Sequence, residues 1–113
     1  MADLSDAALD QVAHYFKALS EPMRLKLLNR LRDSPANVGE LAQACGCTMA
    51  NASKHLSLLA KQGIVCRSNQ GTHVYYQIAN QTIYALCDLV CGSLALQIEQ
   101  QANWFKSAQT ATE

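Results

Sequence analysis

The sequence predicts a mainly α-helical domain with a small β-ribbon, arranged as a winged helix-turn-helix. Residues 38–78 carry this prediction, because a helix-like segment, a break at Gly46-Cys47, a second helix-like segment and two short strands follow one another there. The second helical segment has small polar residues in its N-terminal half and leucines behind them, which is typical of a helix that enters a DNA groove. A ribbon directly after such a helix forms a wing.

Two amphipathic helices are predicted before this region. The first covers Ser5–Ala18, where apolar residues recur at three- and four-residue steps, namely Leu9, Val12, Ala13 and Phe16. Ser20 is predicted to cap the second helix, with Pro22 in its first turn and Ser34-Pro35 at its end.

Capping signals delimit the next two helices. Asn37 followed by Glu40 resembles a capping box and predicts a third helix, which Gly46 ends. Thr48 is predicted to cap a fourth helix that ends near Gln62-Gly63. This fourth helix is expected to bury Ala52, Leu56, Leu58 and Leu59.

A β-ribbon and a long helix complete the chain. β-Branched and aromatic residues predict strands over Ile64–Arg67 and Val74–Ile78, joined by a turn at Asn69–Gly71. A last helix is predicted from about Asn80 past Gln100, with an apolar seam formed by Ile83, Leu86, Cys87, Val90, Leu94 and Ile98. The seam is longer than one small domain needs to cover, so the first and last helices are predicted to form a dimer interface. Packing of the last helix on its own chain alone is the alternative.

Length and composition exclude several classes of function. The 113 residues are expected to form a single domain, residues 1–113, with no room for a separate catalytic domain. The sequence has no Gly-rich phosphate loop and no nucleophile elbow, so an enzyme is not predicted. No run is expected to span a bilayer, and the acidic N-terminus does not resemble a signal peptide. A cytoplasmic protein is expected, whose five cysteines are reduced, metal-binding or redox-active.

Charge is concentrated in the middle of the chain. Residues 20–73 carry seven Lys and Arg against three Asp and Glu, a net charge of +4, and the two flanks together carry −4. A basic centre between acidic ends indicates that the middle contacts phosphate. A solvated surface with no partner is the alternative.

Four segments taken in order resemble the ArsR/SmtB family of bacterial metal- and thiol-responsive repressors: Leu19–Leu25, Val38–Leu41, Ser53–Leu56 and Gly71–Tyr76. The resemblance covers about residues 8–100. It implies a homodimer that binds an inverted repeat of double-stranded DNA and is released by an inducer. It also implies that the fourth helix presents Thr48, Met49, Asn51, Ser53 and Lys54 to the groove, with Arg67 and His73 near the wing. For His55, packing with a satisfied hydrogen bond is favoured over contact with a base.

The chain departs from the family's ligand positions. Where the family's metalloid site has Cys-Val-Cys, this chain has Asn37, Val38 and Gly39. Asn80 and Thr82 stand where another family site begins with Asp and His, so zinc lacks its usual ligands. Members that sense reactive sulfur have a cysteine in the second helix, and here Asn29 lies near that place.

The remaining cysteines are the candidate sensors. Cys87 and Cys91 are four residues apart on the last helix, so they share one face and could hold a soft metal or an arsenite-like metalloid ion, or react with sulfur species or oxidants. Cys45 and Cys47 flank the turn before the fourth helix, whose N-terminus lowers a thiol pKa. In each pair a packing role is the alternative, and Cys66 is expected to be structural.

Three classes of function therefore remain. The favoured one is a repressor released by an inducer that its thiols sense. The second is a constitutive DNA-binding regulator with inert cysteines. The third is a winged helix that binds proteins and not DNA.

Overall fold

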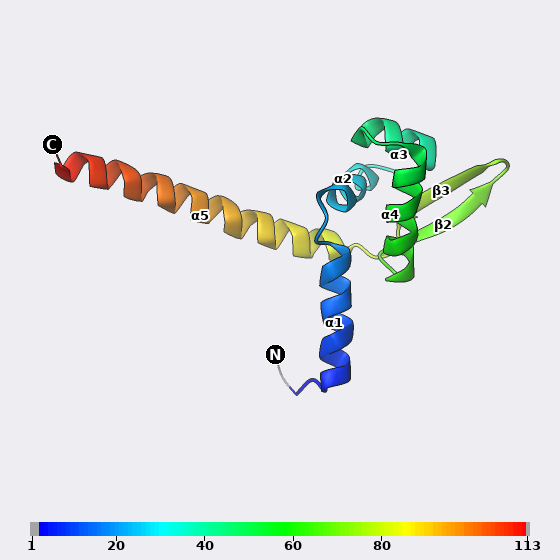
Figure 1. Ribbon diagram of the computed structural model, residues 1–113, viewed down its shortest axis with the longest axis horizontal. Coiled ribbons are helices and arrows are strands. Elements are labelled where there is room, and N and C mark those ends of the chain that lie inside the picture. Colours follow the sequence, from blue (N-terminus) through cyan, green and yellow to red (C-terminus); the bar gives the residue numbers. More distant parts are fainter. Residues whose placement is uncertain (1–2, 113) are drawn as a thin grey trace. The chain divides into compact units, whose positions relative to one another are not determined.

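The structure, a computed structural model, describes residues 3–112, without the side chains of Phe105 and residues 107–112. In that part of the chain the elements are α1 (Asp6–Ala18), α2 (Pro22–Leu31), β1 (Ala36–Asn37), α3 (Val38–Cys45), α4 (Met49–Lys61), β2 (Val65–Gln70), β3 (His73–Ile78) and α5 (Thr82–Thr112) (Figure 1). They form two compact units, one up to Asn80 and one from Gln81 on. The order of helix, turn, helix and ribbon confirms the predicted winged helix-turn-helix.

The caps of the helix-turn-helix lie where the sequence predicts them. Asn37 and Glu40 form the capping box, in which Asn37 Oδ1 accepts the Glu40 N–H at 2.8 Å and Glu40 Oε1 accepts the Asn37 N–H at 3.3 Å. Gly46 ends α3 with a φ of 71°, a left-handed conformation that glycine adopts without steric cost. Thr48 Oγ1 then accepts the Asn51 N–H at 3.1 Å and starts α4. The orientation of α4 is thus encoded locally, by residues on both sides of one tight turn.

The predicted bounds of α2 are wrong at both ends. The N-cap is Glu21 and not Ser20, whose hydroxyl instead donates to the Lys17 carbonyl at 2.7 Å. The cause is Pro22, since a residue before proline is held in the extended region, as Glu21 is. The helix ends at Leu31, before Ser34-Pro35.

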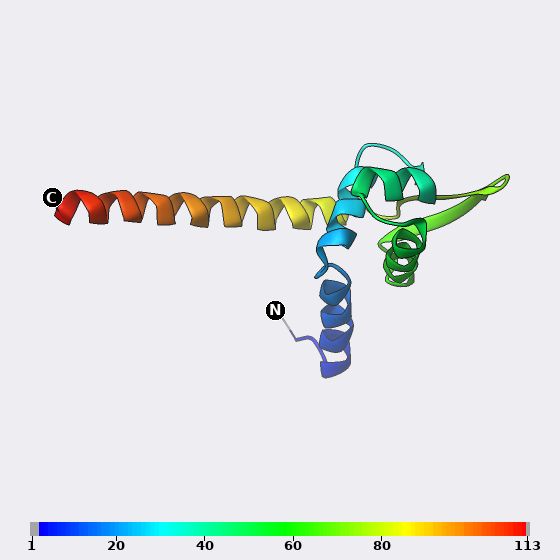
Figure 2. The ribbon, with the colours of Figure 1, turned by 45° about the horizontal axis from the view of Figure 1, so that its top comes forward.

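The sheet is antiparallel, has the order β1-β3-β2 and contains one strand that the sequence did not predict. That strand, β1, pairs Ala36 with Tyr76. Both strands of the ribbon are longer than predicted, and the turn lies at Gly71-Thr72, because Asn69 and Gln70 still pair with β3. Gly71 has a φ of 62°, as the first residue of a two-residue hairpin loop requires. Figure 2 shows the resulting ribbon projecting beside α4.

The core of the first unit lies between α2, α3, α4 and the sheet, and α3 packs against both neighbouring helices. Its buried residues are Leu27, Leu28, Leu31, Ala36, Leu41, Ala42, Ala52, Leu56, Leu59, Ile64, Val65 and Tyr76. Leu58 was predicted to be buried and is only half-buried. Because Ala52, Leu56 and Leu59 fix the inner face of α4, the N-terminal residues on its other faces point to solvent.

Apolar side chains on α1 and α5 are exposed. On α1, Leu9 and Phe16 are 37% and 51% exposed. On α5, Ile83 and Tyr84 are buried, whereas Val90, Leu94 and Ile98 are 49%, 51% and 67% exposed. The seam predicted from the sequence is therefore largely open to solvent in a single chain, and its role as a dimer interface stays a prediction.

The expectation that no run could span a bilayer is wrong on length and composition. The segment Thr82–Trp104 of α5 is long and apolar enough to cross a membrane, and a window of 18 residues in it has a mean hydropathy of 1.3. Only 11% of that window is buried. The segment includes Asp88 and Glu99, and a charged group is costly at the centre of a bilayer.

Candidate nucleic-acid interface

The N-terminal half of α4 presents the polar residues that the sequence predicts as DNA contacts. Thr48, Met49, Asn51 and Lys54 are exposed, and Ser53 is half-buried. They lie outside the row of buried residues on α4, so their side chains are not packed into the core. The hydroxyl of Thr48 is engaged in the cap, whereas the Asn51 amide and the Lys54 ammonium extend from the exposed surface.

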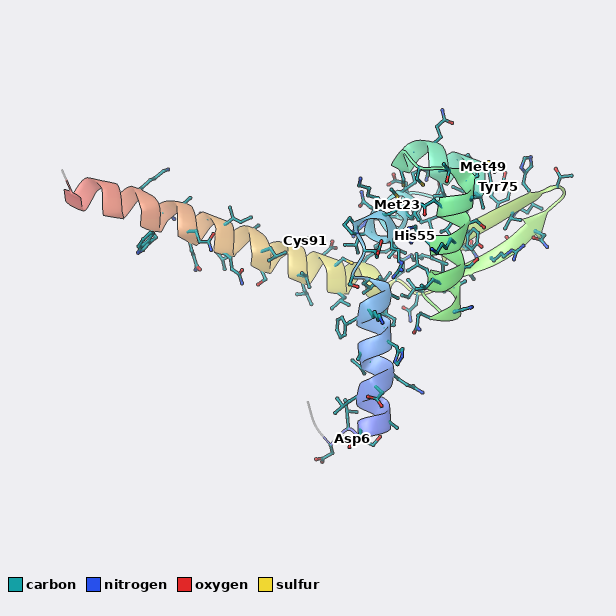
Figure 3. All side chains as sticks on the ribbon, in the orientation of Figure 1. Asp6, Met23, Met49, His55, Tyr75 and Cys91 are labelled. Atoms are coloured by element: carbon teal, nitrogen blue, oxygen red, sulfur yellow. The ribbon has the colours of Figure 1, made fainter. Side chains whose placement is uncertain are left out.

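The wing carries two further residues that the sequence predicts as DNA contacts. Arg67 on β2 and His73 on β3 are both exposed. The His73 ring lies edge-on to the ring of Tyr75, with ring centroids 6.5 Å apart. His73 also lines a pocket of about 580 Å³ together with Met49 and Ser53 of α4, so the start of β3 and the N-terminal half of α4 border one space. Figure 3 marks Met49 at this end of α4.

His55 lies further along α4 and is held by Arg24 of α2. The Arg24 Nε–H donates to His55 Nδ1 at 3.2 Å, so this nitrogen carries no proton. The Nη1 of the same guanidinium donates to the carbonyls of Lys17 and Ala18 at 3.3 and 3.2 Å, at the end of α1. Arg24 therefore ties α1 to α4, and the expectation that His55 has a satisfied hydrogen bond is confirmed. The sequence does not predict the contact between Arg24 and His55, because the two residues are 31 positions apart in the chain.

The five cysteines are distributed over different segments of the chain. All five are present as thiols. Cys87 is half-buried and Cys91 is exposed, one turn apart on α5, and Figure 3 marks Cys91. Cys66 lies on β2, where its thiol donates to the Gln77 carbonyl at 3.8 Å. Within the described residues, no group of three or more His, Cys, Asp or Glu side chains is arranged to hold a metal ion.

Cys45 and Cys47 are half-buried at the turn between α3 and α4. Burial raises the pKa of the Cys45 thiol, and the nearby Cys47 raises it further, while Lys26 and Arg30 act in the opposite direction. Cys45 lines a pocket of about 420 Å³ with these two basic residues. A raised pKa leaves less reactive thiolate at neutral pH, which disfavours Cys45 as the first thiol to react.

The residues at the positions of the family's metalloid ligands belong to the start of α3 in this chain. Asn37 caps α3, and Gly39 follows in its first turn. A Cβ atom at Gly39 would meet Asn37 Oδ1 at 3.4 Å, which is ordinary contact. The capping hydrogen bonds therefore account for Asn37 without any ligand.

Known sequences show where the chain belongs. The family described as "Helix-turn-helix domain" matches residues 19–65. The HTH-type transcriptional regulator Rv0324 of Mycobacterium tuberculosis is 37% identical over 89 residues, which are 79% of this chain. The chain spans only 39% of the length of Rv0324. Further relatives that the chain covers more fully are also HTH-type transcriptional regulators.

Solved structures agree with these sequences. A homodimeric winged helix-turn-helix DNA-binding domain from Mycobacterium bovis, described as a possible ArsR-family transcriptional regulator, has a TM-score of 0.76 and 36% identity and covers 88% of this chain and 95% of its own. The antimony-specific transcriptional repressor AntR has a TM-score of 0.73 and 30% identity, with 87% and 89% covered.

Proposed function

The chain belongs to the ArsR/SmtB family of DNA-binding transcriptional regulators, which are not enzymes, and from this premise we propose that it is a homodimeric, cytoplasmic repressor of an inverted-repeat operator. An inducer sensed by cysteine thiols releases it from the DNA. The observation that carries the proposal is the exposed polar N-terminal half of α4 beside the wing.

DNA contact follows from the chemistry of the exposed residues. Asn51 has the amide that pairs with an adenine edge, and Lys54 supplies a cation for phosphate. Thr48 and Ser53 can donate to phosphate or base edges, and Arg67 and His73 on the wing reach the flanking backbone or minor groove. The net charge of +4 over residues 20–73 also favours contact with phosphate.

Dimerisation accounts for the exposed apolar surfaces of α1 and α5. Leaving Val90, Leu94 and Ile98 in water is unfavourable, and a second copy would cover them. The relative from M. bovis is homodimeric. A dimer interface also suits α5 better than a bilayer does, because Asp88 and Glu99 can remain in water at its edge.

The cysteine pair on α5 is the proposed sensor. On a helix, residues four apart have Cβ atoms about 5–6 Å apart, too far for an unstrained disulfide but close enough for two thiolates to share one soft ion. AntR is antimony-specific, which supports a soft metalloid as one class of inducer. Reactive sulfur or an oxidant acting on the same thiols is the other class.

The reading helix can be tested with two alanine variants. We expect Lys54→Ala to weaken binding to all duplexes and to reduce the salt slope by about one unit for each half-site, because each protomer loses one phosphate contact. Asn51→Ala should also relax sequence preference, at a cost of roughly 1–3 kcal/mol for each half-site. Fluorescence anisotropy with an operator selected from random duplex DNA measures both effects.

Lys61→Ala is the matched control, because it removes the same charge from the exposed C-terminal end of α4. It should bind like the wild type. If Lys54→Ala and Asn51→Ala also bind the operator like the wild type, α4 is not the DNA recognition helix. A protein that binds no duplex at any salt concentration would instead belong to the protein-binding class of winged helices.

A further inference from the structure

Met49 is the most exposed of the large apolar side chains in the unit that ends at Asn80. It is 60% exposed, compared with 51% for Phe16 and 42% for Leu25. Met49 is also the first residue of α4, directly after the Thr48 cap. A large apolar side chain is thus presented to water at the end of the helix that reads DNA, where polar residues would be easier to solvate.

Apolar and polar side chains both surround Met49. Its methyl group lies near the start of α3, since a Cβ atom built on Gly39 would be 3.9 Å from Met49 Cε. The pocket of about 580 Å³ that Met49 lines has three other apolar side chains, Val38, Ala50 and Val74, and the polar side chains Asn37, Ser53, Thr72 and His73. Met49 itself cannot form a hydrogen bond with a base, so this side chain can recognise only an apolar group of the DNA.

We propose that Met49 recognises the C5 methyl group of a thymine in each half-site of the operator. The N-terminal residues of a recognition helix contact base edges in the major groove, and the thymine methyl is the apolar group displayed there. The flexible thioether chain of methionine can follow that methyl as the helix docks. This inference rests on the proposed function. It assigns apolar recognition of a base to Met49, in addition to the hydrogen bonding to a base that is assigned to Asn51.

The test replaces thymine by deoxyuridine, which removes only the methyl group and leaves every hydrogen-bonding atom in place. In the selected operator, thymines are replaced one symmetric pair at a time, and affinity is measured by fluorescence anisotropy. At one symmetric pair, this replacement should weaken wild-type binding about fourfold per half-site, which corresponds to the free energy of burying one methyl group. Met49→Ala should bind the unmodified operator more weakly. At that pair alone, it should also lose the uracil penalty, which is the loss of affinity caused by replacing thymine with deoxyuridine.

Two further variants separate recognition from folding. Met49→Gln keeps the length of the side chain and removes its apolar end, so it should also lose the penalty. Leu25→Ala, which shortens an exposed apolar residue of α2 outside the reading head, should retain it. Circular dichroism is expected to give the same melting temperature for Met49→Gln and the wild type, because the side chain is exposed.

The possible outcomes distinguish this inference from the proposed function. If the wild type binds the operator but Met49→Ala and Met49→Gln keep the wild-type uracil penalty at every position, the recognition by Met49 is refuted and the repressor proposal stands. The same holds if no uracil pair weakens the wild type. If the wild type binds no duplex, both proposals fail.

Discussion

The double change Cys87→Ser with Cys91→Ser should abolish inducer-driven release and leave operator affinity within about twofold of the wild type, because Cys91 is exposed, Cys87 is only half-buried and neither residue is on the helix that is proposed to contact DNA. Serine keeps the shape of each side chain but cannot bind a soft ion or be oxidised to a sulfenic acid or a disulfide. Anisotropy with the selected operator, before and after adding arsenite, antimonite, persulfide or peroxide singly, measures both affinity and release.

The large effect follows from the geometry of a dimeric DNA-binding protein. Two recognition helices must match half-sites about 34 Å apart, so a shift of a few ångströms in a shared helix spoils the fit. An inducer that binds the DNA-binding and the released conformations equally well could not release the DNA. A difference of about 1–3 kcal/mol between its binding free energies for the two conformations is sufficient. Without the two thiols, no such preference remains on α5.

Cys66→Ser is the matched control, because it removes an exposed thiol from the wing and leaves α5 intact. It should respond to the inducer like the wild type. Normal release by the double variant would place the sensor elsewhere, and Cys45 with Cys47 would be the next pair to exchange. If none of the added compounds releases the reduced wild type, the chain is a constitutive regulator with inert cysteines.

Leu94→Glu should convert the dimer into a monomer at micromolar concentration. It places a carboxylate in the middle of the apolar seam of α5, where association would bury it without a partner. Operator affinity should fall by about 10²–10⁴-fold, because the second half-site no longer gains from the first. Sedimentation velocity and anisotropy measure the two effects.

Asn103→Glu provides the control for added charge on α5. It is exposed and lies on the side of the helix opposite Leu94. This variant should remain dimeric and keep its affinity. A wild-type protein that sediments as a monomer at micromolar concentration would contradict the dimer, as would a Leu94→Glu variant that sediments as a dimer.

Sequence reasoning succeeded where a feature is encoded by neighbouring residues. The capping box at Asn37, the left-handed Gly46 and the Thr48 cap each depend on residues within one turn. It failed where the interacting residues are far apart in the sequence. A two-residue strand such as β1 has no periodicity, and it exists only because β3 pairs with it. The misplaced cap of α2 was avoidable, because Pro22 already restricts Glu21.

The same contrast holds for the candidate site. The residues of α4 could be predicted because an amphipathic helix divides its faces in a regular way, and the structure exposes those residues except for half-buried Ser53. The pocket shared by Met49 and His73 required the fold, since α4 and β3 meet only in space. The link from Arg24 to His55 required it for the same reason.

Whether the chain is a dimeric DNA-binding repressor is best decided by measuring how the reduced wild-type protein binds its selected operator over a range of salt concentrations. We expect two chains per operator. The logarithm of the binding constant should fall linearly with the logarithm of salt concentration, because lysines and arginines displace counterions from phosphates. A protein that binds no duplex, or whose binding is independent of salt, would contradict the proposed function.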